Sequence, residues 1–185
     1  MTTFNGGTGN DSATGSIYDD TLSGNAGNDT LVSSDGQDQL YGGDGADKLY
    51  AGTGNDYAAG DAGDDLIYLG EGLDTGVGGI GNDTLYGEGG NDGLWGENGA
   101  DLLYGGTGMD TLNGGRDSDT VDGGADADWV AGGAGADSLL GGSGNDTLRG
   151  DIIFVTPSAS YGSANITNSF TNQATFAIDI YWVDY

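Results

Sequence analysis

The sequence predicts an all-β fold, a parallel β-roll in which the chain winds as a β-solenoid of two parallel sheets with 18 residues per coil. Three observations support this prediction. An aspartate recurs at every ninth residue sixteen times, and an aliphatic residue follows it by two positions in thirteen of these units. Glycine supplies 41 of the 185 residues, so no stretch favours a helix. A fixed short period over most of a chain indicates a stacked repeat architecture.

The repeat consists of sixteen nine-residue units, from residue 6 to residue 149, with the aspartate at position six. These aspartates are Asp11, Asp20, Asp29, Asp38, Asp47, Asp56, Asp65, Asp74, Asp83, Asp92, Asp101, Asp110, Asp119, Asp128, Asp137 and Asp146. Position one is glycine except at Ser33, Ala51 and Leu69, and position four is glycine except at Tyr18, Asp117 and Asp126. Position eight is Leu, Ile or Val except at Ala13, Ala58 and Gly76.

Each position of the unit has a physical role. Glycine at positions one and four is expected to supply backbone angles closed to other residues and to let carbonyl groups approach a ligand. Tyr18 is a poor substitute there, so we expect the second turn to be distorted. Positions seven to nine are expected to form a short strand, and its alternation turns position eight toward the core. One unit therefore makes a turn and a strand, and two units make one coil.

Composition excludes several classes of function. The formal net charge is -27, from 30 acidic and 3 basic residues, so nucleic acid and anionic membrane surfaces are excluded as partners and cations are favoured. The chain has no His and no Cys, which excludes Ser-His-Asp and Cys-His catalysis and disfavours zinc. No apolar run approaches the ~18 residues of a membrane-spanning helix. Residues 1–10 lack the features of an ordinary secretory signal. We therefore expect a protein that is not an enzyme.

Two units show the repeat most clearly, residues 78–86 (GGIGNDTLY) and residues 141–149 (GGSGNDTLR). They resemble the RTX nonapeptide, Gly-Gly-x-Gly-x-Asp-x-apolar-x, of hemolysin-type calcium-binding proteins, and the resemblance covers residues 6–149. It implies that a Ca²⁺ ion lies between the turns of units n and n+2, bound by aspartate carboxylates and by backbone carbonyls of the glycine-rich loop. Besides the sixteen aspartates, the implied ligands are Gly78, Ile80, Gly81, Gly96, Asn98, Gly99, Gly105, Thr107, Gly108, Gly123, Ala125, Gly132, Ala134, Gly141 and Ser143.

Stacking places the aspartates of odd units along one edge and those of even units along the other, at the ~4.8 Å spacing of paired strands. Such rows repel strongly without a cation. Calcium accepts six to eight oxygen ligands in flexible geometry, whereas magnesium requires a tighter octahedron. Seven gaps on each edge allow at most about 14 ions, with weak sites expected near Tyr18, residues 33–35 and residues 69–77. Two other roles for these aspartates, turn capping without metal and a glycosidase-like acid pair, remain open but are disfavoured.

One aliphatic side chain per nine residues cannot offset both chain entropy and carboxylate repulsion. We therefore expect a disordered chain without calcium, as its acidic, glycine-rich composition also allows, and a folded chain with calcium. The resemblance implies a bacterial protein exported unfolded by type I machinery, which folds outside the cell or at its surface. Extracellular calcium modules bind at about 10⁻⁴–10⁻³ M.

The chain divides into the roll at residues 1–150 and a C-terminal segment at residues 151–185, where the period stops. Residues 175–183 are rich in β-forming side chains. We expect a small β cap over the last coil, because repeat proteins need such a cover. The segment also resembles a type I export signal. As a further alternative, residues 166–185 resemble the opening strands of a von Hippel-Lindau β-domain-like sandwich, which would end here incomplete.

Position nine points away from the core and carries a row of tyrosines 18 residues apart: Tyr50, Tyr68, Tyr86 and Tyr104. This row is expected to stiffen the sheet by cross-strand packing, and a protein or glycan partner on the same face is the alternative. The leading function is calcium binding by a secreted module. The alternatives are an adhesive or structural surface protein, or the non-catalytic tail of a larger secreted enzyme or toxin, although residues 1–5 leave no room for a catalytic domain.

Overall fold

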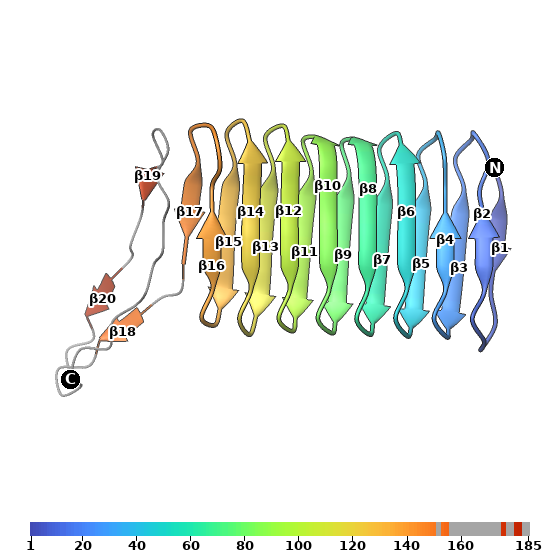
Figure 1. Ribbon diagram of the computed structural model, residues 1–185, viewed down its shortest axis with the longest axis horizontal. Helices are drawn as coiled ribbons and strands as arrows, with labels where there is room; N and C mark the ends of the chain where they lie inside the picture. The colour runs from blue at the N-terminus through green and yellow to red at the C-terminus, as the bar shows by residue number, and fades with distance from the viewer. Residues whose placement is uncertain (151–152, 156–174, 177–179, 183–185) are drawn as a thin grey trace.

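The computed structural model describes residues 1–150, 153–155, 175–176 and 180–182. Parallel strands alternate between two sheets along the chain, so the molecule is a solenoid seen from the side in Figure 1. Between β1 and β17, paired strands lie 18 residues apart, as in the register of Leu85 with Leu103. The predicted all-β parallel roll, with two sheets and 18 residues per coil, is confirmed.

The larger sheet has ten strands, in the order β1, β3, β5, β7, β9, β11, β13, β15, β17, β19. They are β1 (Thr3–Asn5), β3 (Thr21–Ala26), β5 (Gln39–Asp44), β7 (Tyr57–Ala62), β9 (Thr75–Ile80), β11 (Gly93–Asn98), β13 (Thr111–Arg116), β15 (Trp129–Ala134), β17 (Thr147–Arg149) and β19 (Thr175–Phe176). The smaller sheet has eight strands: β2 (Ser12–Thr14), β4 (Thr30–Val32), β6 (Lys48–Thr53), β8 (Leu66–Gly72), β10 (Thr84–Gly90), β12 (Leu102–Thr107), β14 (Thr120–Ala125) and β16 (Ser138–Leu140).

Most strands are six or seven residues long, which is longer than the predicted three. They continue through positions one to three of the following unit, but position one drops out of the pairing. Between β10 and β12, for example, the register runs to Tyr86↔Tyr104 and resumes at Glu88↔Gly106. Position one therefore marks a break in the ladder, at the point where each strand approaches its turn.

Position eight forms the core, as predicted. Its side chains are buried in one cluster that runs the length of the roll, from Ala13 to Leu148. Gly76 is the exception at this position, and a Cβ built there would lie 3.1 Å from Cδ1 of Leu69. Leu69 stands at position one of the same unit and is fully buried. It supplies the apolar volume that Gly76 lacks, so the two departures from the repeat compensate each other.

The backbone requirement for glycine differs from the prediction at one position. Positive φ occurs at positions two and four, as at Gly79 (117°) and Gly81 (145°), whereas position one is absent from the positive-φ residues of the described chain. Asp117, at position four, adopts φ 73° as an aspartate can. Tyr18 does not adopt a positive φ, so its turn has a different backbone path, in line with the distortion predicted for it.

Beyond residue 150 the described strands are short. β19 extends the larger sheet by pairing with β17, through Thr147↔Thr175 and Leu148↔Phe176. β18 (Ile153–Val155) pairs with β20 (Ile180–Trp182) in a separate two-stranded sheet. The rest of the predicted cap, export signal and sandwich-like segment lies outside the described residues. Within the part that is described, no helix is long and apolar enough to cross a membrane.

Candidate metal centres

The repeated aspartates form two continuous columns, one at each edge of the roll. The backbone N–H of one aspartate donates a hydrogen bond to Oδ1 of the aspartate 18 residues further on. Examples are the bonds from Asp65 to Asp83 and from Asp83 to Asp101, both 2.8 Å long. The series begins at Asp11 and Asp20 and ends at Asp137 and Asp146. The odd and even units therefore stack on opposite edges, as predicted.

The second carboxylate oxygen, Oδ2, is the notable atom of these columns. In eleven aspartates within the described coils, Oδ2 is buried and has no hydrogen-bond partner. They are Asp29, Asp47, Asp56, Asp65, Asp74, Asp83, Asp92, Asp101, Asp110, Asp119 and Asp128. Burying a charged oxygen without a compensating partner is costly, so each of these atoms calls for a cation or a proton.

Position one explains why glycine is required beside this oxygen. A Cβ built on Gly123 would lie 2.6 Å from Oδ2 of Asp128 and 2.8 Å from the carbonyl oxygen of Gly141 in the next coil. Both distances are shorter than the 3.0 Å that real Cβ atoms keep. A carboxylate oxygen and a carbonyl oxygen thus converge on one point that only glycine leaves free. Oxygen donors of this kind suit Ca²⁺.

Electrostatics in the central coils agree with this reading. Burial, together with the charges of neighbouring acidic residues, raises the pKa of Asp65, Asp83 and Asp92 to about 7, despite the lowering effect of the backbone hydrogen bond. The same causes raise the pKa of Asp119 and Asp128 to about 7. At neutral pH these carboxyl groups are near their midpoint, so a bound cation or a bound proton would stabilise the column.

Side chains alone do not complete a metal site. Among the residues that the structure describes, no three His, Cys, Asp or Glu side chains gather as a metal-binding group. A cation here would need backbone carbonyls as well. The carbonyls of Ile80 and Asn98, predicted as ligands, already accept hydrogen bonds from Gly63 and Gly81, at 2.7 and 2.9 Å. An ion bound to the carbonyl oxygens of Ile80 and Asn98 would share them with these hydrogen bonds between coils. The carbonyl oxygens of position one, in contrast, lie near Oδ2 of the aspartates.

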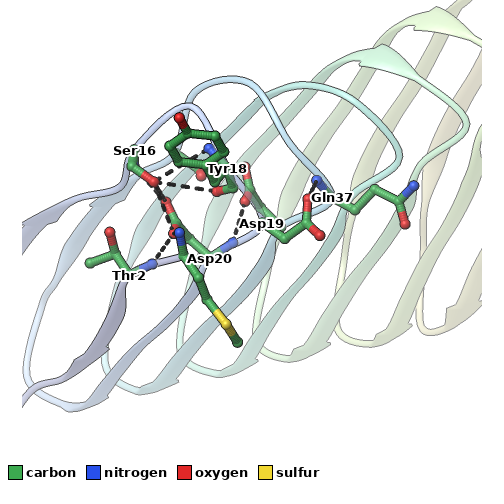
Figure 2. A network of polar contacts seen from close by, with 9 residues as sticks. Thr2, Ser16, Tyr18, Asp19, Asp20 and Gln37 are labelled. Atoms are coloured by element: carbon green, nitrogen blue, oxygen red, sulfur yellow. Dashed lines mark hydrogen bonds and ion pairs between the residues drawn. The ribbon is translucent and has the colours of Figure 1, made fainter.

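The turn at Asp20, drawn in Figure 2, differs from the central turns in its hydrogen bonds. Its Oδ1 accepts the amide of Thr2, and its Oδ2 accepts the amide and, at 2.9 Å, the hydroxyl of Ser16. Burial raises the pKa of Asp20, but these hydrogen bonds outweigh it and lower the pKa to about 2. In the next turn on this edge, the Ser33 hydroxyl donates to Oδ2 of Asp38. The sequence predicted weak sites at these two turns but assigned no role to the hydroxyls of Ser16 and Ser33, although a hydroxyl at position one or two of the same unit was a visible signal.

The predicted tyrosine row is present on the outer face of the smaller sheet. The rings of Tyr50, Tyr68, Tyr86 and Tyr104 stack in order, with centroids 5.3, 4.7 and 5.0 Å apart and planes within 9° of parallel. Each inner ring is covered by a neighbour on both faces. This arrangement supports cross-strand packing, and partner recognition on this face remains a prediction.

The comparison with protein families agrees with the geometry. The model of the RTX calcium-binding nonapeptide repeat matches residues 5–40, 41–76, 70–103, 104–139 and 122–152. No curated protein matches the chain. The repeats of this family bind calcium and typically serve a structural rather than a catalytic purpose. Since the family model spans nearly all of the roll, the chain belongs to the RTX calcium-binding nonapeptide repeat family.

Proposed function

We propose that the chain is a calcium-dependent folding module, in which Ca²⁺ ions bind between neighbouring aspartates of each column and hold the coils together. One observation carries the proposal: eleven buried Oδ2 atoms lack a partner within the described coils, and nine of them belong to units with glycine at position one. We assign Oδ2 of each repeated aspartate and the position-one carbonyl of the next coil as ligands. The remaining carbonyl ligands come from positions three and four of the loop, as predicted for residues 78–81.

Charge and spacing support several ions. Fourteen hydrogen-bonded aspartate pairs link successive coils, seven on each edge, and each marks one gap. Filling every gap would bring about 14 divalent ions, whose charge is close to the -27 of the chain. We take this number as the upper limit.

The setting that fits this chemistry is extracellular. At the affinities of about 10⁻⁴–10⁻³ M that extracellular calcium modules show, the columns would remain empty of calcium in the cytosol and fill outside the cell. A chain without calcium would be unfolded and suited to type I export, with its signal in the C-terminal segment. We assign no catalytic activity, because the repeated carboxylates are equivalent along each column and the chain has no His or Cys.

A calcium titration followed by circular dichroism and calorimetry tests the proposal. We expect β structure to appear together with heat of binding at millimolar Ca²⁺, with a stoichiometry of several ions per chain. Magnesium at the same concentration is the matched control and should produce far less folding, because its octahedral geometry fits flexible loops poorly. Calcium that neither binds nor changes the spectrum would refute the proposed function.

A further inference from the structure

We propose that the two turns at residues 15–20 and 33–38, the first two on the even edge, are closed by serine hydroxyls in place of calcium. This inference rests on the proposed function, since it states which turns the calcium column leaves out. It makes Ser16 and Ser33 the residues that decide where the even column of ions begins.

The first support is the state of the two carboxylates. Asp20 and Asp38 are as buried as the central aspartates, at 2% and 1% exposure. Yet their Oδ2 atoms have partners: the amide and hydroxyl of Ser16 for Asp20, and the hydroxyl of Ser33 for Asp38. Hydrogen bonds of this kind stabilise the charged carboxylate, so these two groups have no need of a cation.

The second support is the position of the Ser33 side chain. In a regular turn, the point beside a position-one glycine faces a carbonyl oxygen of the next coil, as Gly24 faces that of Gly42 at 2.7 Å from a built Cβ. Beside Gly15, the same point lies 3.0 Å from Oγ of Ser33 and 2.7 Å from Oδ2 of Asp20. The Ser33 hydroxyl therefore lies where a regular turn has a carbonyl oxygen that could bind a cation. The Cβ of Ser33 also occupies a position that is empty when position one is glycine.

The third support is the backbone. Positive φ at position two occurs in the neighbouring odd units, at Asn25 (76°) and Gly43 (109°), but neither Ser16 nor Ser34 is among the described residues that adopt it. The strands that lead into these turns, β2 and β4, have three residues, whereas β3 and β5 in the same coils have six. In the first odd unit Gly7 also lacks a positive φ and β1 also has three residues, so the difference between the two edges begins at the second coil.

Asp29 separates this effect from fraying at the end of the roll. It lies between the two serine turns in sequence, on the odd edge, and its buried Oδ2 has no partner in the described coils. The odd column thus requires a cation at a point where the even column does not. Oδ2 of Asp11, in the first odd turn, accepts the amide of Gly7 at 2.7 Å, so Asp29 is the first carboxylate of the odd column that lacks such a partner within the described residues. The second coil should therefore carry calcium on the odd edge only, and the later coils on both edges.

Crystals grown in saturating Ca²⁺ and measured for anomalous scattering test the inference directly. We expect peaks within coordination distance of Asp29, Asp65 and Asp83, and none bound to the carboxylates of Asp20 or Asp38. A calcium peak on Asp20 or Asp38 would overturn the inference and leave the proposed function intact. Absence of calcium from both columns would instead overturn the proposed function.

Variants give a second test in solution. Ser16→Gly with Ser33→Gly removes both hydroxyls and leaves Tyr18 and Ser34 in place, and native mass spectrometry at saturating Ca²⁺ should then count about one or two more ions than in the unmodified chain. Ser138→Gly, at an exposed serine on β16 outside the turns, is the matched control and should leave the count unchanged. Equal counts for the double variant and the unmodified chain would contradict the inference.

Discussion

The N-terminal and central coils share one repeat, yet they stabilise their aspartates differently. At Asp20, hydrogen bonds from Ser16 and Thr2 satisfy both carboxylate oxygens and lower the pKa to about 2. At Asp83, Oδ2 has no partner in the described coils, and burial raises the pKa to about 7. The amide and the hydroxyl of Ser16, which both donate to Oδ2 of Asp20, separate the two cases. The comparison indicates that the aspartate repeat buries a carboxylate oxygen in each turn. The residues at positions one and two then determine whether hydrogen bonds or a metal ion stabilise that oxygen.

Removing calcium should have the largest effect on this comparison. With excess EDTA at pH 7.5, we expect the central coils to unfold, because about 1–3 kcal/mol for each uncompensated buried group, over eleven groups, exceeds the stability of a typical domain. Far-UV circular dichroism should lose its β signal and regain it when calcium is restored. An unchanged β spectrum in chelator would show that the columns do not need metal.

A matched pair of substitutions sharpens the comparison. Asp83→Asn keeps the Oδ1 acceptor for the Asp65 amide but removes the charge, so the calcium concentration at the folding midpoint should rise about tenfold, equivalent to about 1.4 kcal/mol. Asp20→Asn should also weaken folding, because its amide group cannot accept both bonds from Ser16, but it should leave the number of bound ions unchanged, since that carboxylate binds no ion. Circular dichroism during calcium titration measures the midpoint, and native mass spectrometry counts the ions. Loss of an ion in Asp20→Asn, as expected for Asp83→Asn, would contradict the distinction between the two regions.

Acidification should partly replace calcium in the central coils. Their folded-state pKa of about 7 lies above the ~3.9 of an unfolded aspartate, so protonation favours the folded state. This stabilisation is complete below the unfolded value and is lost as the pH rises through about 7. The calcium-free chain should therefore gain β structure between pH 8 and pH 5. Asp20, whose pKa is lowered, should contribute the opposite sign, and only below about pH 4.

Circular dichroism in chelator over this pH range measures the effect. Asp65→Asn combined with Asp83→Asn is the control, because two groups with raised pKa values are then absent and the acid-induced gain should shrink. A spectrum that does not change between pH 8 and pH 5 would contradict the assignment of uncompensated carboxyls to the central coils.

The smallest effect concerns the tyrosine row, which spans the central coils and has Thr14 and Val32 in its place in the N-terminal ones. Tyr86→Ser removes two stacked contacts, each worth about 0.5–1.5 kcal/mol, and should lower the stability of the calcium-loaded roll by about that sum. Urea unfolding in saturating calcium measures the loss, with Thr84→Ser on the same strand as control. Unchanged stability would remove the packing role and leave recognition as the reason for the row.

Much of the architecture could be predicted because a strict period states which residues share an edge. The 18-residue coil, the odd and even aspartate columns and the buried position eight all follow from counting by nine. The strand length and the reason for glycine at position one did not follow. Position one is glycine because of a close approach by Asp Oδ2 and not because of its backbone angle, and the period contains no information about that distance.

The sequence by itself determined the coil, the membership of each column and the acidic character that makes a cation the natural partner. Only the tertiary structure decided which aspartate Oδ2 atoms are left without a hydrogen-bond partner in the described coils, and that Ser16 and Ser33 supply a partner in two turns. It also decided how Leu69 fills the space beside Gly76. The physical reason is that a repeat specifies which positions stack, whereas hydrogen bonding and packing depend on atoms that approach one another across a turn or between coils, where single departures from the repeat decide the outcome.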